Sequence, residues 1–191
     1  AELLNRHFST VYTKDNGTHT GLPLMKSGNA LSNVTFSESK VLAVLKRLKR
    51  KSAGGPDGIP AVFYKECATN LVHPLARLFQ IGFDFSYLPG IWKFAFVSTV
   101  LEKGNASLVS NYRPISLTCT MCKIMERVIN DAMLKYLSSC NLISKRQHGF
   151  LSKHSTSTNL LESKYDWSLA LDSRKPVDIA YIDFSRAFDS V

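Results

Sequence analysis

The chain has 191 residues, of which 24 are lysine or arginine and 15 are aspartate or glutamate, so its formal net charge is +9. Hydrophobic residues make up 45% of the sequence and charged residues 20%, a balance that is typical of globular domains and excludes disordered and collagen-like chains. No apolar run approaches the roughly 18 residues of a transmembrane helix, so we expect no membrane span. The excess of positive charge favours a polyanionic partner.

Helices are predicted in the first quarter of the chain. Apolar spacing predicts a short helix over residues 1–12 and, after a loop that reaches about residue 33, a second helix over residues 36–50. Thr35 and Glu38 have the spacing of a capping box, which satisfies free backbone N–H groups at the start of a helix. The second helix therefore has both an apolar face and an expected N-terminal cap.

A glycine-rich segment follows this helix. Three glycines, a proline and an aspartate within residues 51–58 predict a structured turn. Pro60 suits the first turn of the next helix, and we expect Pro74 to break or restart that helix because proline has no backbone N–H. A dense basic run lies at the end of the 36–50 helix, with Lys40 before it, and it fits either a solvated helix C-terminus or a contact with a polyanion. The run consists of Lys46, Arg47, Lys49, Arg50 and Lys51.

Strand-forming residues become frequent after Trp92. The pieces around residues 94–101 and 111–117 favour extended structure, and the turn Lys103-Gly104-Asn105 lies between them. We therefore predict a β-hairpin with a basic tip.

The last third of the chain returns to helical spacing before it alternates. Helices are predicted over residues 118–139 and 156–171, on either side of a polar and basic segment at 141–154. Alternation over residues 177–184 predicts a strand with Asp183 at its C-terminal edge. The predicted fold class is therefore mixed, α/β (α+β).

Cysteine and histidine give no sign of a metal or nucleophile site. Cys119 and Cys122 have CxxC spacing, but no second pair completes a zinc site. The few cysteines do not make a disulfide framework, so we expect a reduced, intracellular chain. His148 and His154 have no partner at the spacing of a nucleophile and base, and we interpret them as surface or nucleic-acid contacts.

The segment from Asp183 to Val191 (DFSRAFDSV) resembles motif A of the reverse transcriptases of non-LTR retrotransposons. The resemblance extends back through almost the whole chain, with the blocks in the family's order, and is greatest to the Jockey-like branch. The other blocks are Lys51–Pro60 (KSAGGPDGIP), Leu88-Pro89 with Trp92-Lys93, Lys103-Gly104, Asn111–Leu117 (NYRPISL), and Gln147–Phe150 (QHGF) with Ser155-Thr156.

The resemblance implies an RNA-directed DNA polymerase, in which a DNA primer 3′-OH attacks a dNTP on an RNA template with two Mg²⁺ ions bound. Asp183 matches the motif A aspartate that binds both ions, and the backbone carbonyl of Phe184 would be a further ligand. Phe188 matches the aromatic steric gate that excludes the ribose 2′-OH. Arg113 matches the fingers arginine over the incoming triphosphate, since its planar fork fits phosphate oxygens, and Lys103 is the candidate for the lysine beside it.

Further residues are candidates for nucleic-acid contact. Gln147, Gly149 and Phe150 match a block that lies against the template and the incoming base, and the basic candidates are Lys51, Lys145 and Arg146.

Other readings remain open for the residues of the site. Arg113 also fits an ion pair with a surface carboxylate, and Phe188 also fits a core position. Gly54, Gly55 and Gly58 are interpreted mainly as a fixed turn that shapes the base of the fingers.

The resemblance also divides the chain and shows one departure. It implies an N-terminal helix and loop (1–35), a fingers region (36–175) and the start of the palm (176–191), an incomplete right-hand polymerase fold. Glu102 places a negative charge where the family usually has a cation, near the expected path of the triphosphate.

Activity is expected to be limited. Because the family's Asp-Asp signature is absent from the sequence, we expect no polymerase activity from this chain alone. The alternatives are a fragment that binds RNA or an RNA–DNA hybrid and a non-functional transposon relic. The resemblance implies a nuclear or cytoplasmic location.

Overall fold

The computed structural model describes residues 1–11, 31 and 33–184, so Phe188 lies outside the described residues. The chain divides into two compact units, with described residues 1–134 in the first and 135–184 in the second. Within the described ranges, no helix is both long and apolar enough to cross a membrane.

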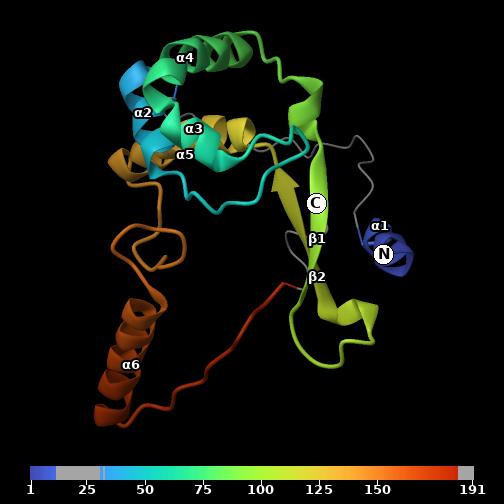
Figure 1. Cartoon of the computed structure of the whole chain (residues 1–191). Helices are drawn as coiled ribbons and strands as arrows, with labels where there is room; N and C mark the ends of the chain where they lie inside the picture. Colours follow the sequence, from blue (N-terminus) through green and yellow to red (C-terminus); the bar gives the residue numbers. More distant parts are fainter. Residues whose placement is uncertain (12–30, 32, 185–191) are drawn as a thin grey trace. The chain divides into compact units, whose positions relative to one another are not determined.

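Helices precede and follow a single β-hairpin, so the described residues have the mixed helix and strand content that the sequence predicts (Figure 1). They are α1 (Glu2–Ser9), α2 (Glu38–Arg47), α3 (Ala61–Glu66), α4 (Ala68–Asp84), the 3₁₀ turn η1 (Gly90–Lys93), β1 (Ala95–Leu101), the 3₁₀ turn η2 (Val109–Asn111), β2 (Tyr112–Thr118), α5 (Thr120–Ser139) and α6 (Thr156–Asp172).

The core of the first unit lies among α2, α3, α4 and the first half of α5. Its largest fully buried side chains include Phe79, Leu45 and Ile124, which come from three different helices. The ring of Phe79 packs against those of Phe36 and Trp92, with centroids 5.9 and 6.0 Å away. Trp92 and Cys119, which flank the two hairpin strands, belong to the same core and hold the base of the hairpin against it. Burial of a large apolar side chain contributes about 1.5–3 kcal/mol.

The start of α2 differs from the predicted capping box. Ser37 occupies the N-cap and makes no side-chain capping bond, so Glu38 is the first helical residue and is too early to reach back to a cap. Glu38 instead lies 2.7 Å from the imidazole of His73 on α4, and Lys40 donates to the hydroxyl and carbonyl oxygens of Thr35. The helix is the predicted one, but its cap was predicted wrongly.

The expected break at Pro74 is also wrong. Pro74 lies inside α4, which continues to Asp84, and the break between α3 and α4 comes at Cys67. Proline removes one helical hydrogen bond, but the buried side chains of Val72 and Leu75 on either side hold the helix against the core.

The hairpin agrees with its prediction. Strands β1 and β2 are antiparallel, and the register pairs Ala95 with Thr118 at the base and Leu101 with Tyr112 near the tip. The tip turns at Gly104, whose φ of +76° favours glycine.

The helices at 120–139 and 156–172 agree with the sequence, but residues 177–184 do not form the predicted strand. Tyr181 and Phe184 are 88% and 77% exposed. In the described part of the chain the only sheet is the β1–β2 hairpin. Without a neighbouring strand, the alternating pattern has no ladder of hydrogen bonds to form.

Candidate nucleotide and nucleic-acid site

The glycine-rich turn supports the base of the hairpin. The backbone N–H of Gly58 donates to the carbonyl of Gly55 at 3.0 Å, which closes the turn. Gly55 is buried against the junction of β2 and α5: a Cβ there would lie 2.5 Å from the Cα of Cys119 and 2.6 Å from the carbonyl carbon of Thr118. No side chain fits in this space. The turn is therefore a fixed support, as the sequence indicated.

Polar contacts shape the tip of the hairpin. The side-chain amide of Asn111 donates to the carbonyl of Asn105 at 2.9 Å, and the Tyr112 hydroxyl donates to the carbonyl of Ala106 at 2.9 Å. The backbone N–H of Glu102 donates to the carbonyl of Asn111 at 2.9 Å, which extends the ladder by one residue. Lys103 follows directly and is exposed to solvent. The tip thus holds a lysine on a compact, hydrogen-bonded turn.

Arg113 forms an ion pair across the hairpin. Its Nε lies 2.7 Å from Oε2 of Glu102, and the two side chains are 63% and 40% exposed. The register explains the pairing, because Val100 lies opposite Arg113 and Glu102 follows two residues later. The pairing with a surface carboxylate is therefore present. Sequence analysis singled out both residues but did not predict that they touch.

The basic segment after α2 is partly engaged within the protein. Arg50 pairs with Glu66 at 2.7 Å, and Lys65 donates to the carbonyl of Leu48 at 2.8 Å. Lys51 is exposed. These contacts fasten the end of α2 to α3, so Arg50 contributes to local structure whereas Lys51 is accessible to a ligand.

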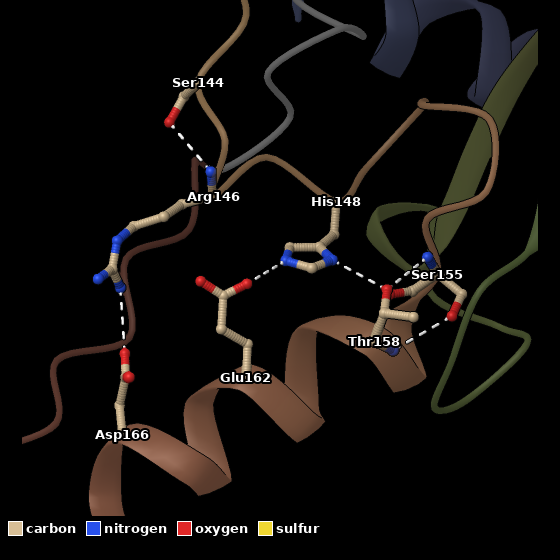
Figure 2. A network of polar contacts seen from close by, with 7 residues as sticks. All are labelled: Ser144, Arg146, His148, Ser155, Thr158, Glu162 and Asp166. Atoms are coloured by element: carbon tan, nitrogen blue, oxygen red, sulfur yellow. Dashed lines mark hydrogen bonds and ion pairs between the residues drawn. The ribbon is translucent and has the colours of Figure 1, made fainter.

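In the second unit, a polar and basic loop at residues 141–154 precedes α6, and His148 attaches this basic loop to the helix (Figure 2). Its Nε2 lies 2.8 Å from Oε2 of Glu162, and its Nδ1 lies 2.9 Å from the hydroxyl oxygen of Thr158. The His148 side chain is only 8% exposed. The interpretation of His148 as a surface or nucleic-acid contact is therefore wrong, because its partners lie on a helix farther along the chain and give no local signal.

Two further contacts hold the same loop (Figure 2). Arg146 Nη1 lies 3.2 Å from Oδ2 of Asp166, and Ser155 caps α6 through a reciprocal capping box with Thr158. Between these attachments the loop carries Phe150, which is 92% exposed and has a φ of +62°. A bulky side chain is unusual at positive φ. The attachments on either side of Phe150 hold its backbone in this conformation.

The remaining loop candidates precede Phe150 in the same segment of the chain. Lys145, Gln147 and Gly149 are exposed, and the Gln147 amide donates to the carbonyl of Gly149 at 3.3 Å. These three residues and Phe150 are thus exposed on one loop, whereas Arg146 is engaged by Asp166.

Asp183 and Phe184 lie in the exposed segment at the end of the described residues. A carboxylate is the ligand type that Mg²⁺ prefers. Within residues 1–11, 31 and 33–184, however, no group of three or more His, Cys, Asp or Glu side chains could hold a metal ion. Asp183 therefore supplies a carboxylate of suitable chemistry, but the described residues do not form a complete divalent-cation site.

The CxxC pair belongs to the core. Both thiols are buried, and the thiol of Cys122 donates to Oε1 of Glu126 at 3.1 Å. Burial, followed by this hydrogen bond and the charge of Glu126, raises the pKa of Cys122 to about 12. A thiol held in its neutral form is a poor metal ligand.

Comparison with known proteins identifies a group of relatives. Residues 101–191 match the sequence profile of the family described as Reverse transcriptase (RNA-dependent DNA polymerase). The chain is 31% identical over 162 residues to the RNA-directed DNA polymerase from mobile element jockey of Drosophila melanogaster, an alignment that covers 84% of this chain and 18% of the relative.

Two other relatives give similar alignments. The chain is 28% identical over 159 residues to the jockey polymerase of Drosophila funebris, covering 83% of this chain and 17% of the relative. It is 24% identical over 153 residues to the probable RNA-directed DNA polymerase from transposon BS of D. melanogaster, covering 80% and 17%. The chain thus spans less than a fifth of the length of these curated relatives.

Proposed function

We propose that this chain, which belongs to the reverse transcriptase family of non-LTR retrotransposons, forms the nucleotide-facing part of an RNA-directed DNA polymerase. In this reaction a primer 3′-OH attacks the α-phosphate of a deoxynucleoside triphosphate paired with an RNA template, and pyrophosphate leaves. The chain would supply the fingers and first palm segment of a right-hand fold. Divalent cations, proposed to be Mg²⁺, stabilise charge on the phosphate oxygens when they are bound.

The observation that carries this proposal is the arrangement of Lys103 and Arg113 on one short hairpin. Lys103 lies in the hydrogen-bonded tip and Arg113 is the second residue of β2, on a hairpin whose base is supported by Gly55 and the core. A lysine supplies a point charge and an arginine a planar fork, and together they suit the oxygens of a triphosphate. Their role is to bind and orient the nucleotide before attack.

Three residues at the end of the chain have proposed roles that follow from the family. Asp183 would supply one carboxylate ligand to the cations, and the carbonyl of Phe184 a second oxygen. Phe188 would exclude the ribose 2′-OH and so favour deoxynucleotides. Because the described residues do not form a complete cation site, we ascribe no reaction step to these side chains beyond ligation and exclusion.

Primer extension by a longer polypeptide tests this function. The chain would be joined to the remaining part of a reverse transcriptase domain and assayed on an RNA template with a DNA primer. We expect Asp183→Ala to abolish extension and Asp178→Ala, a matched change in the same exposed segment, to retain it. Equal extension by the Asp183→Ala variant and its parent would refute the assignment.

Nucleic-acid binding by the chain itself is a second candidate function. It is favoured by the net charge of +9 and by the exposed aromatic ring of Phe150 on a tethered basic loop. Stacking of a base on such a ring contributes about 1–3 kcal/mol, and each neutralised phosphate adds about 0.7 to the salt dependence for a single strand.

Titration with single-stranded RNA at several salt concentrations tests this second function. We expect affinity to fall steeply with salt and Phe150→Ala to weaken binding about five- to 150-fold. Phe85→Ala, which removes another exposed phenylalanine, is the control and should change affinity little. A flat salt dependence would rule out the electrostatic account.

A further inference from the structure

We propose that Glu102 competes with the triphosphate for the guanidinium of Arg113 and thereby lowers the nucleotide affinity of the hairpin site. The inference rests on the proposed function of Arg113 as a triphosphate ligand. It assigns an inhibitory role in nucleotide binding to Glu102, the residue whose negative charge departs from the family pattern.

The contact itself is short and directional. The distance of 2.7 Å between Arg113 Nε and Glu102 Oε2 is that of a charge-assisted hydrogen bond. Carboxylate and phosphate oxygens are the same kind of hydrogen-bond acceptor for a guanidinium. A phosphate that approaches Arg113 Nε–H therefore has to displace the carboxylate of Glu102. Glu102 thus takes the place that a phosphate oxygen would take.

The backbone of the hairpin sets this pairing. The register places Val100 opposite Arg113, and the bond from Glu102 N–H to the Asn111 carbonyl keeps Glu102 in line with β1. The pair is therefore a property of the strand register and not of a loose surface side chain. In the ligand-free hairpin the register therefore holds Arg113 and the carboxylate of Glu102 within reach of each other.

The pair is weak enough to be displaced. Both side chains are substantially exposed, and exposed ion pairs contribute little to stability because water screens them. A triphosphate carries several negative charges and also attracts Lys103, so it can replace one carboxylate at Arg113. We therefore expect Glu102 to reduce affinity by about two- to fivefold and not to abolish binding.

Titration of the 191-residue chain with inorganic triphosphate tests the inference, with binding followed at the Arg113 Nε–Hε resonance by NMR and by calorimetry. Glu102→Gln should bind about two- to fivefold more tightly, and Glu102→Lys more tightly still. Asp131→Asn removes the same charge from another exposed pair, with Arg127 at 3.1 Å on α5, and should leave affinity unchanged. Unchanged or weaker binding by both Glu102 variants would overturn the inference.

Arg113→Gln separates this inference from the proposed function. If Arg113 binds triphosphate, this change weakens binding, and adding Glu102→Gln to it should restore much less affinity than the same change does in the parent chain. If Arg113→Gln weakens binding but Glu102→Gln has an equal effect with or without Arg113, the competition is refuted and the role of Arg113 stands. If Arg113→Gln has no effect on binding, the proposed role of Arg113 fails, and the competition fails with it.

Discussion

The imidazole of His148 lies 2.8 Å from the carboxylate of Glu162, although the two residues are 14 positions apart and belong to different elements. The contact closes the basic loop onto α6. Because His148 also meets Thr158, one nearly buried ring connects the loop to two successive turns of the helix. The backbone position of Phe150 therefore depends on His148, Thr158 and Glu162, none of which is proposed to contact nucleic acid.

We predict that His148→Ala loosens the loop between residues 145 and 155. The change removes two side-chain hydrogen bonds from a nearly buried group, so local stability should fall by about 1–3 kcal/mol. Hydrogen exchange of the loop amides measures this loss. Glu162→Gln keeps an oxygen acceptor and should lose less protection than Glu162→Ala. Unaltered exchange in His148→Ala would contradict the prediction.

A second prediction concerns the turn beneath the hairpin. Gly55→Ala should destabilise the first unit by about 1–3 kcal/mol or more, because the new Cβ would overlap the backbone of Cys119 and Thr118, which cannot move without shifting β2 and α5. Gly54→Ala is a matched control, since its Cβ would meet only the carbonyl oxygen of Ile59 at an ordinary 3.7 Å. Thermal unfolding of both variants measures the difference, and equal midpoints would count against a packing role for Gly55.

Periodicity revealed the elements of this fold because burial follows local spacing. The amphipathic helices α2 and α5 and the β1–β2 hairpin each have an apolar or strand-forming pattern within a single segment, and their limits were predicted to within a few residues. The capping box predicted at Thr35 and Glu38 does not form because α2 begins at Glu38, whose carboxylate contacts His73 on a helix distant in sequence. The segment 177–184 has the pattern of a strand, but pairing depends on a neighbour that the pattern does not specify.

The residues of the candidate site were found through the motif, whereas their contacts were not. Arg113 and Glu102 were both identified, but their pairing depends on hairpin register, which one residue of slippage would change. His148 was misread because its partners lie on α6. Residue types thus indicated chemistry, and only the tertiary fold determined which charges are already engaged.

Pro74→Ala is predicted to stabilise the chain. Pro74 is exposed in the second turn of α4, so its replacement loses little packing and restores a backbone N–H to the helix. The gain in helix propensity is partly offset by a more flexible unfolded chain, and we expect a net increase of about 1–2 kcal/mol in unfolding free energy. Denaturant unfolding measures it, with Arg77→Ala on the same helix as a control near zero. A lower midpoint for Pro74→Ala would show that the proline fits its site.

The last prediction is that stability falls as the pH rises from about 9 to 12. Burial, with a smaller effect from the charge of Asp57 and then from Cys119, raises the pKa of Tyr64 from 10.0 to about 12. Burial and Glu126 raise the pKa of Cys122 from 9.0 to about 12. Over this range the unfolded chain has released protons that the folded chain still holds, so rising pH favours unfolding.

Denaturant unfolding at pH 8 to 11.5 measures this alkaline loss. At pH 8 both groups are protonated in the folded and unfolded states, so their contribution is fully present there. Tyr64→Phe removes the tyrosine contribution, and its stability should decline less steeply above pH 10 than that of the parent. Tyr87→Phe, a change at an exposed ring, should leave the slope unchanged. If Tyr64→Phe and the parent decline in parallel between pH 10 and 11.5, the buried hydroxyl is not the group that couples proton release to unfolding.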